Sequence, residues 1–283
     1  MVIIADGKKI SLAILRKAKE RVNQLRKHNI TPRLAVILVG KDKPSQTYVK
    51  KKEEAAKKIG VNFFLYHYLE NISNEELVSE IKKIQTKEKL SGLIVQLPLP
   101  DTIDTEKVLN AIDPKIDVDY LTFNNLGKLV MGNNELIPPT PGAALEILDY
   151  YNVDLEGKYV VLIGRGKLIG KPLANIFIHR PVTLSVCNST TKNLAEFTKR
   201  ADIIVTGVGK YNILTGEMVK KGAAVVDTGV CFKDGKMYGD IDFESVKEKA
   251  SVVTPTPGGV GPITVAKLLE NTVMNAEIMF NKD

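Results

Sequence analysis

Two kinds of hydrophobic pattern alternate along this chain. Short continuous apolar runs, typical of strands buried in a parallel sheet, are separated by segments whose apolar residues recur with the period of an amphipathic helix. In the first half this pattern predicts strands at 34–39, 62–69 and 92–97 and helices at 11–28, 44–59 and 73–87. Ser11 is placed to open the first helix, and Ser73 with Glu76 forms a capping box for the third.

The second half repeats the alternation after an interruption. Between residues 113 and 141 Gly, Pro and Asn accumulate and the helical period is lost, so we expect a junction between two domains there. Beyond it the pattern predicts strands near 158–163, 182–187, 202–206, 223–227 and 251–254, then a helix from Thr264 to about Phe280. Such alternation predicts an α/β fold with parallel sheets.

Composition and charge narrow the class of protein. A chain of 283 residues with 44% hydrophobic and 26% charged residues is typical of a globular protein with two cores. No apolar stretch approaches the ~20 residues that span a bilayer, so no membrane association is expected. Two distant cysteines and three scattered histidines favour a reducing, cytoplasmic location without a structural metal.

The net charge of +7 is spread over many helical segments. The densest cluster, Lys50–Lys52, has no interleaved aromatic ladder, so no nucleic-acid partner is expected. A modest positive field still helps to gather polyanionic ligands.

The run KYVVLIGRGKLIGKP (158–172) carries the first functional signal. An apolar strand ends in Gly164, Gly166 and Gly170, and Pro172 suits the first turn of a following helix. Glycines let the backbone approach a phosphate, so the run is typical of the start of a dinucleotide site, although its spacing is one residue longer than the usual pattern. An ordinary glycine-rich turn is the alternative.

The end of the next strand indicates which dinucleotide is bound. It reads Asn188-Ser189-Thr190, without the carboxylate that NAD-binding folds place on the ribose hydroxyls. Arg165 and Ser189 can instead bind a 2′-phosphate by hydrogen bonds, which favours NADP over NAD. The alternative is that Ser189 or Thr190 only caps the helix beginning near Asn193.

Polar side chains in the first half supply candidate chemistry. Tyr48 and Lys52 share one helix face, although such a pair is usually a solvated surface feature. Gln96 ends a buried strand, where α/β proteins bind ligands, unless it only satisfies the loop backbone. Asp117 and Asp119 would point to one side of an extended segment. An Asp can accept two hydrogen bonds from a 2-amino-pyrimidinone edge, but is more often a turn residue.

Six segments, in this order and spacing, resemble one known family. They are VGKDKPSQTYVKKK (39–52), GLIVQLPLP (92–100), DPKIDVD (113–119), PTPGAALEIL (139–148), GRGKLIGKP (164–172) and TPTPGGVGPITVAKLLENT (254–272). Together they look like bifunctional methylenetetrahydrofolate dehydrogenase/methenyltetrahydrofolate cyclohydrolase, over nearly the whole chain. Six ordered motifs are much harder to obtain by chance than one glycine turn.

The resemblance implies two domains with folate bound in a cleft between them. A three-layer α/β catalytic domain would comprise residues 1–138 plus 265–283, and a Rossmann-type NADP-binding domain residues 139–264. The family usually forms homodimers, and its tetrahydrofolate substrates can be polyglutamylated.

The resemblance also implies the site residues. Lys52 would be the central catalytic residue with Gln96 and Tyr48 beside it, and Asp119 would bind the pterin amino edge. The implied substrate-binding set is Tyr48, Val95, Gln96, Leu97, Asp119, Pro257, Gly258, Gly259, Val260 and Gly261. The implied cofactor-binding set is Gly164, Arg165, Gly166, Ser189 and Val230, with no metal.

The implied activity is NADP-dependent oxidation of 5,10-methylenetetrahydrofolate, followed by hydrolysis of the methenyl product to 10-formyltetrahydrofolate. Lys52 would assist proton transfer, which requires burial or a neighbouring cation to lower its pKa from about 10.4. Two alternatives stand beside this reading: a dehydrogenase without cyclohydrolase activity, against which Tyr48, Lys52 and Gln96 argue, and a basic nucleotide- or nucleic-acid-binding module.

Three residues depart from the family pattern. Tyr120 stands where a glycine usually follows the second Asp, Gly166 where a serine is common, and Asn188 where a histidine is frequent. If the backbone at position 120 requires a positive φ, a tyrosine there is strained, and either the local backbone or the Asp119 contact differs. The loss of a hydroxyl at 166 removes one cofactor hydrogen bond, worth about 1 kcal/mol.

Overall fold

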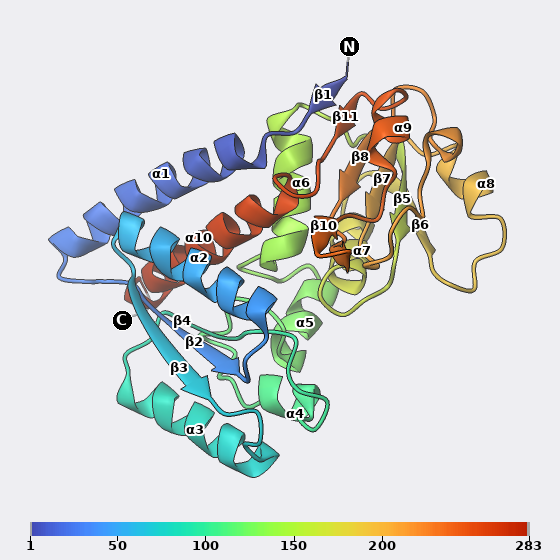
Figure 1. The fold of residues 1–283 in the computed structure, drawn as a ribbon. Coiled ribbons are helices and arrows are strands. Elements are labelled where there is room, and N and C mark those ends of the chain that lie inside the picture. The colour runs from blue at the N-terminus through green and yellow to red at the C-terminus, as the bar shows by residue number, and fades with distance from the viewer. Residues whose placement is uncertain (1, 282–283) are drawn as a thin grey trace. The chain divides into compact units, whose positions relative to one another are not determined.

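The computed structural model describes residues 2–281, and these divide into two compact units. The first unit comprises Leu12–Pro139 and the chain from Val265 onward, and the second comprises the chain up to Ser11 together with Thr140–Thr264. Two long helices, α1 (Gly7–Lys27) and α10 (Val260–Phe280), each begin in the second unit and continue in the first (Figure 1).

The first unit is built on a three-stranded parallel sheet. Its strands lie in the order β3 (Asn62–Tyr68), β2 (Arg33–Val39) and β4 (Gly92–Val95). The central strand is buried on both faces, since Ala35 and Ile37 pack with Leu77 and Ile81 on one side while Val36 is equally buried on the other. Helices on both faces explain the continuous apolar run of this strand.

The helices of the first unit have clear local determinants. They are α2 (Lys43–Ile59), α3 (Asn74–Lys87), α4 (Thr105–Leu109) and α5 (Phe123–Val130). The Asp42 carboxylate accepts a hydrogen bond from the Ser45 backbone N–H at the start of α2, and Gly60, with φ of 85°, ends it. The predicted capping box of Ser73 and Glu76 is present at the start of α3.

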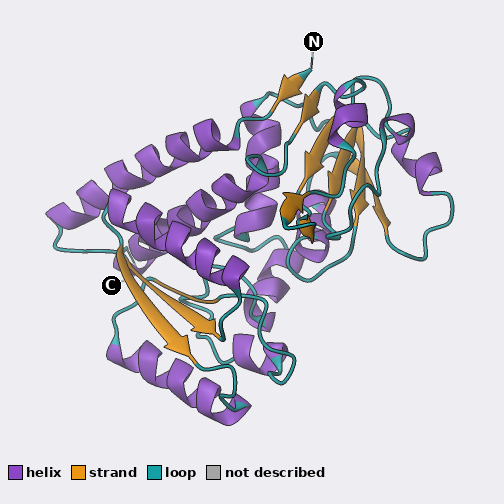
Figure 2. Ribbon diagram, in the orientation of Figure 1, coloured by secondary structure: helices purple, strands orange, loops and turns teal. Residues whose placement is uncertain are grey.

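The second unit is built on a six-stranded parallel sheet (Figure 2). Its strands lie in the order β1 (Ile3–Ile4), β11 (Val252–Val253), β8 (Ala224–Asp227), β7 (Ile203–Thr206), β5 (Lys158–Ile163) and β6 (Val182–Cys187). The remaining elements are α6 (Pro139–Tyr150), α7 (Gly170–Ile178), α8 (Leu194–Thr198), the 3₁₀ helix η1 (Gly216–Met218), α9 (Phe243–Lys247), and a hairpin of β9 (Cys231–Lys233) and β10 (Lys236–Tyr238).

The structure confirms the alternating α/β pattern and corrects several boundaries. The segment expected to be an irregular junction contains α5, α1 begins at Gly7 rather than Ser11, and α10 begins at Val260 rather than Thr264. The Asp6 carboxylate, and not Ser11, accepts a hydrogen bond from the first turn of α1. Short β1, β9 and β10 were not predicted.

The N-terminal strand belongs to a different unit from the one that the resemblance implies. β1 pairs in parallel with β11, so the chain up to Ser11 lies in the second unit rather than with the rest of the N-terminal half. Within residues 2–281 no helix is long and apolar enough to cross a membrane. Cys187 and Cys231 are both free thiols.

Candidate functional site

The first unit brings Lys52 and Gln96 into direct contact. Lys52 lies on α2, which packs on β2 and β3, and Gln96 follows the end of β4. The Lys52 Nζ donates a hydrogen bond to Gln96 Oε1 at 2.9 Å, and Gln96 Nε2 donates in turn to the backbone oxygen of Leu97 at 2.6 Å. The amide therefore has one defined orientation, with its oxygen toward the amine.

Burial sets the electrostatics of this pair and of Asp119. It lowers the pKa of Lys52 from its ordinary value, and the Asp119 carboxylate offsets part of this change. It raises the pKa of Asp119 to about 6, against the opposite effect of the Lys52 ammonium. The site thus holds an amine and a carboxylate whose uncharged forms are both favoured by the surroundings, as is common where protons are transferred.

The other predicted residues of this unit lie close in sequence to the pair but differ in exposure. Tyr48 is half-buried one turn before Lys52, and the Lys51 ammonium lies 5.5 Å from the centroid of its ring. Leu97 is partly buried and supplies the carbonyl that orients Gln96. Val95 is only 1% exposed and packs in the core.

Asp117 and Asp119 have different roles, which corrects the expectation that both point to one side. Asp117 is buried and accepts hydrogen bonds from the backbone N–H groups of Leu121 and Thr122 and from the Asn125 amide. The segment is a turn rather than an extended strand, which breaks the period of two. Asp117 shapes the turn, whereas Asp119 is partly exposed.

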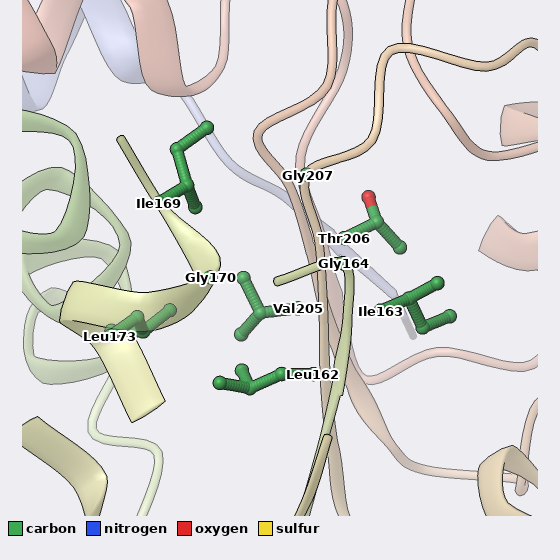
Figure 3. Close-up of a pocket in the computed structure, with 9 residues that line it drawn as sticks. All are labelled: Leu162, Ile163, Gly164, Ile169, Gly170, Leu173, Val205, Thr206 and Gly207. Carbon is green, nitrogen blue, oxygen red and sulfur yellow. The ribbon is translucent and has the colours of Figure 1, made fainter. Parts of the chain in front are cut away.

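The second unit places the glycine turn where a nucleotide site would begin. Gly164 follows β5 with φ of 114°, and α7 starts at Gly170. Figure 3 shows the small pocket between this turn and the end of β7, lined by Leu162, Ile163, Gly164, Ile169, Gly170, Leu173, Val205, Thr206 and Gly207. A Cβ on Gly170 would lie 2.2 Å from the Gly164 oxygen, so only glycine permits the close packing of turn and helix.

The same turn fits the pyrophosphate of a dinucleotide. Ile169, at the N-cap of α7, supplies no side-chain acceptor for the first turn of the helix, and a Cβ at Gly166 would meet no atom within 4 Å. Open backbone beside a helix N-terminus is the usual surface for a phosphate. Arg165, between the two glycines, is exposed.

The remaining predicted cofactor residues follow neighbouring strands. Ser189 follows β6, and Val230, which is 41% exposed, follows β8. The alternative role of Ser189 or Thr190 as a helix cap is wrong, because Asn193 is the N-cap of α8 and no side chain bonds there. Thr190 instead donates its hydroxyl to Asn188 Oδ1 at 2.7 Å.

Two buried carboxylates that sequence reasoning missed support these loops. Asp240 accepts hydrogen bonds from the backbone of Val208 and Lys210, both at 2.8 Å, and Asp227 accepts from Gly229 at 2.9 Å. Burial, followed by the charge of Asp240, raises the pKa of Asp227 to about 6. The signal available in the sequence was weak: Asp227 ends an apolar strand, and a glycine follows two residues later at 229.

The predicted substrate loop at 257–261 lies in the second unit. Gly258, with φ of 108°, presents its carbonyl to the Gly7 N–H at 3.0 Å, and Gly259 bonds back to Pro255. Val260 and Gly261 belong to the first turn of α10 rather than to a loop. Over residues 2–281 no group of acidic, His and Cys side chains is arranged to hold a metal ion.

Comparison with known proteins gives the class of this chain. Residues 138–280 match the family model described as the NAD(P)-binding domain of tetrahydrofolate dehydrogenase/cyclohydrolase, and residues 5–119 match its catalytic domain. The chain is 46% identical over 275 residues to the bifunctional protein FolD of Nautilia profundicola, with 97% of each chain covered.

Solved structures agree with this assignment. The bifunctional FolD enzyme of Campylobacter jejuni is 41% identical with a TM-score of 0.95, over 99% of this chain and 100% of that one. The Trypanosoma brucei enzyme, solved with NADP and an inhibitor, is 34% identical with a TM-score of 0.94, over 99% and 98%. Fold and site define a two-domain α/β protein with an NAD(P)-binding domain. The chain belongs to the tetrahydrofolate dehydrogenase/cyclohydrolase family.

Proposed function

We infer that this protein oxidises 5,10-methylenetetrahydrofolate with NADP⁺ and hydrolyses the resulting methenyl cation to 10-formyltetrahydrofolate. The observation that carries the cyclohydrolase half is the Lys52–Gln96 hydrogen bond next to Asp119, with the pKa of Lys52 lowered by burial. The dehydrogenase half rests on the NAD(P)-binding domain in the same chain.

Lys52 is the group that moves the proton. Because burial lowers its pKa, a larger fraction of the amine is neutral near pH 7–8 than for a lysine in water, and a cationic substrate lowers the pKa further. The neutral amine takes a proton from the water that attacks the methenyl carbon. Gln96 cannot titrate, so it holds Lys52 in place through its oxygen.

Asp119 and Tyr48 bind the substrate. The carboxylate of Asp119 accepts two hydrogen bonds from the amino-pyrimidinone edge of the pterin, and an ionised acceptor makes these bonds strong. The half-buried ring of Tyr48 packs against the pterin face. The backbone at Pro257–Gly261 supplies a surface without side-chain bulk at Gly258, where an added Cβ would meet nothing within 4 Å.

The cofactor is held by the glycine turn and the loops after the neighbouring strands. Backbone N–H groups at the start of α7 suit its pyrophosphate, while Arg165 and Ser189 suit the 2′-phosphate of NADP. When bound, NADP⁺ supplies the hydride acceptor. Val230 follows the end of β8 and contributes a partly exposed apolar surface at the same edge of the sheet.

We propose that the protein works in the cytoplasm as a homodimer on polyglutamylated folates. A net charge of +7 favours polyanionic ligands. β3 is an edge strand that presents Leu65, at 45% exposed, and Leu69, just beyond its end, at 70%, and an exposed edge strand is a template for pairing with another chain.

Absorbance of the methenyl product tests the function. Methylenetetrahydrofolate is incubated with NADP⁺ or NAD⁺, and the product is then followed as it hydrolyses. We expect faster formation with NADP⁺ and hydrolysis well above the uncatalysed rate. No product with either nucleotide contradicts the dehydrogenase, and a product that decays only at the uncatalysed rate identifies an enzyme without cyclohydrolase activity.

A further inference from the structure

Tyr120, next to Asp119, has an unusual backbone for its residue type. Its φ is 61°, in the left-handed region that is strained for an L-residue with a side chain. The other non-glycine residues with positive φ within 2–281 are all Asn or Asp, and all are exposed: Asn29, Asn152, Asn193, Asn212 and Asp234. Tyr120 is a bulky residue in this conformation, and it is only 3% exposed.

The side chain of Tyr120 is anchored at its far end. The hydroxyl lies beside the backbone N–H groups of Glu135 and Leu136, and the residue is buried. These contacts join the turn that carries Asp119 to the segment between α5 and α6, fifteen residues further along the chain. A strained backbone persists when its surroundings hold it, and here the phenol provides that hold.

The residues on either side of Asp119 are also fixed. The Asn271 amide on α10 donates to the Val118 carbonyl at 3.0 Å, and the Tyr120 N–H donates to the Asp117 carbonyl at 3.3 Å. Asp117 then holds the backbone of Leu121. Asp119 thus lies between two anchored neighbours, and its carboxylate direction follows from the left-handed turn at Tyr120.

We propose that Tyr120 is a positioning residue for folate recognition. Its anchored phenol maintains the left-handed turn that directs the Asp119 carboxylate toward the pterin edge beside Lys52. The proposal rests on the function inferred above. It accounts for a tyrosine at a position where strain would favour glycine: the anchor offsets the strain and fixes the turn before substrate binds.

Two substitutions at this position test the proposal. Tyr120→Phe keeps the packing and removes the hydroxyl, whereas Tyr120→Gly relieves the φ strain and removes the anchor. We expect each to raise the KM for the folate in both reactions by about 5- to 10-fold, the cost of roughly one lost hydrogen bond, while the KM for NADP⁺ stays within about twofold.

Matched variants separate positioning from general stability. Tyr68→Phe removes another tyrosine hydroxyl of the same unit, which bonds to Glu80 at 3.2 Å, and Asn152→Gly relieves the same kind of strain in the second unit. Neither should change the folate KM. Thermal unfolding is recorded for all variants, because a purely structural role would change the melting temperature alone.

The outcomes distinguish this proposal from the function on which it depends. An inactive parent protein contradicts the proposed function. If the parent is active and the folate KM of either folded Tyr120 variant stays within about twofold of the parent value, the positioning role is overturned. The turn then holds Asp119 without the phenol.

Discussion

Burial shifts the pKa values of Lys52 and Asp119 in opposite directions. It lowers the pKa of the amine and raises that of the carboxylate to about 6, so ionising either group in this site costs free energy. The proposed function requires a neutral amine for proton transfer and an ionised Asp119 for the pterin edge. On this proposal the charge on Asp119 is maintained for function at the expense of stability.

Asp119→Asn should make this cost visible. A folded-state pKa near 6, above the ordinary 3.8, means that the stabilising contribution of Asp119 is complete below about pH 4 and is lost as pH rises through 6. The variant should therefore be more stable than the parent at pH 8, by up to about 3 kcal/mol, with a smaller difference at pH 5. Urea unfolding at the two pH values measures this.

Asp117→Asn is the matched control for that prediction. Asp117 accepts bonds from the backbone of Leu121 and Thr122 through different oxygens, and an asparagine has only one acceptor oxygen. This variant should lose stability at pH 8. If Asp119→Asn is instead destabilised as much as Asp117→Asn, the Asp119 carboxylate is part of the fold and is not maintained at its expense.

Arg165 determines the choice of cofactor in this account. Arg165→Ala should raise the KM for NADP⁺ by about 10- to 100-fold, because a hydrogen bond to a charged group contributes roughly 1.5–3 kcal/mol. Use of NAD⁺, which has no 2′-phosphate, is the internal control and should change much less. Equal losses with both nucleotides would show that Arg165 does not bind the 2′-phosphate.

At the scale of elements, α10 links segments that are distant in sequence within the first unit. The buried Asn271 amide donates to the carbonyls of Val118 and Ile137, and one turn later Asn275 donates to those of Ser91 and Lys115. Two side chains on one helix face thus satisfy four loop carbonyls. This explains how the irregular loops around the proposed folate site stay ordered.

Asn271→Ala should therefore destabilise the protein strongly. Two buried carbonyls lose their donor, and we expect a loss of about 2–3 kcal/mol in the free energy of unfolding by urea. The exposed Asn133 offers a control, since Asn133→Ala should change stability by less than about 0.5 kcal/mol. Equal stabilities of the two variants would mean that the Asn271 bonds contribute nothing.

The long elements could be predicted from sequence because their signals are local. The strand at 34–39 is an apolar run, and the helix starting after Ser73 has its capping box in the sequence. The start of α10 was obscured by the glycine and proline of its first turn, VGP at 260–262. A strand of two residues such as β1 depends entirely on its pairing with β11, which no local pattern shows.

For the whole molecule, the site was only partly predictable. The i, i+4 spacing of Tyr48 and Lys52 and the position of Gln96 at a strand end singled out Lys52 and Gln96, which the structure brings into contact. The contact between Lys52 and Gln96, the turn made by Asp117, and the support from Asp227 and Asp240 all depend on tertiary packing. Sequence motifs named candidate residues, and packing determined which of them meet.

Two reactions at one folate site are the central claim, and Lys52→Met tests it most directly. Methionine keeps an apolar stem and removes the amine, so both rates are measured on one folded preparation, with the exposed Lys50→Met as control. We predict that methenyl hydrolysis falls by at least ~100-fold, while NADP⁺-dependent oxidation falls by a smaller factor and the control keeps both rates. Hydrolysis within a few-fold of the parent would contradict the account.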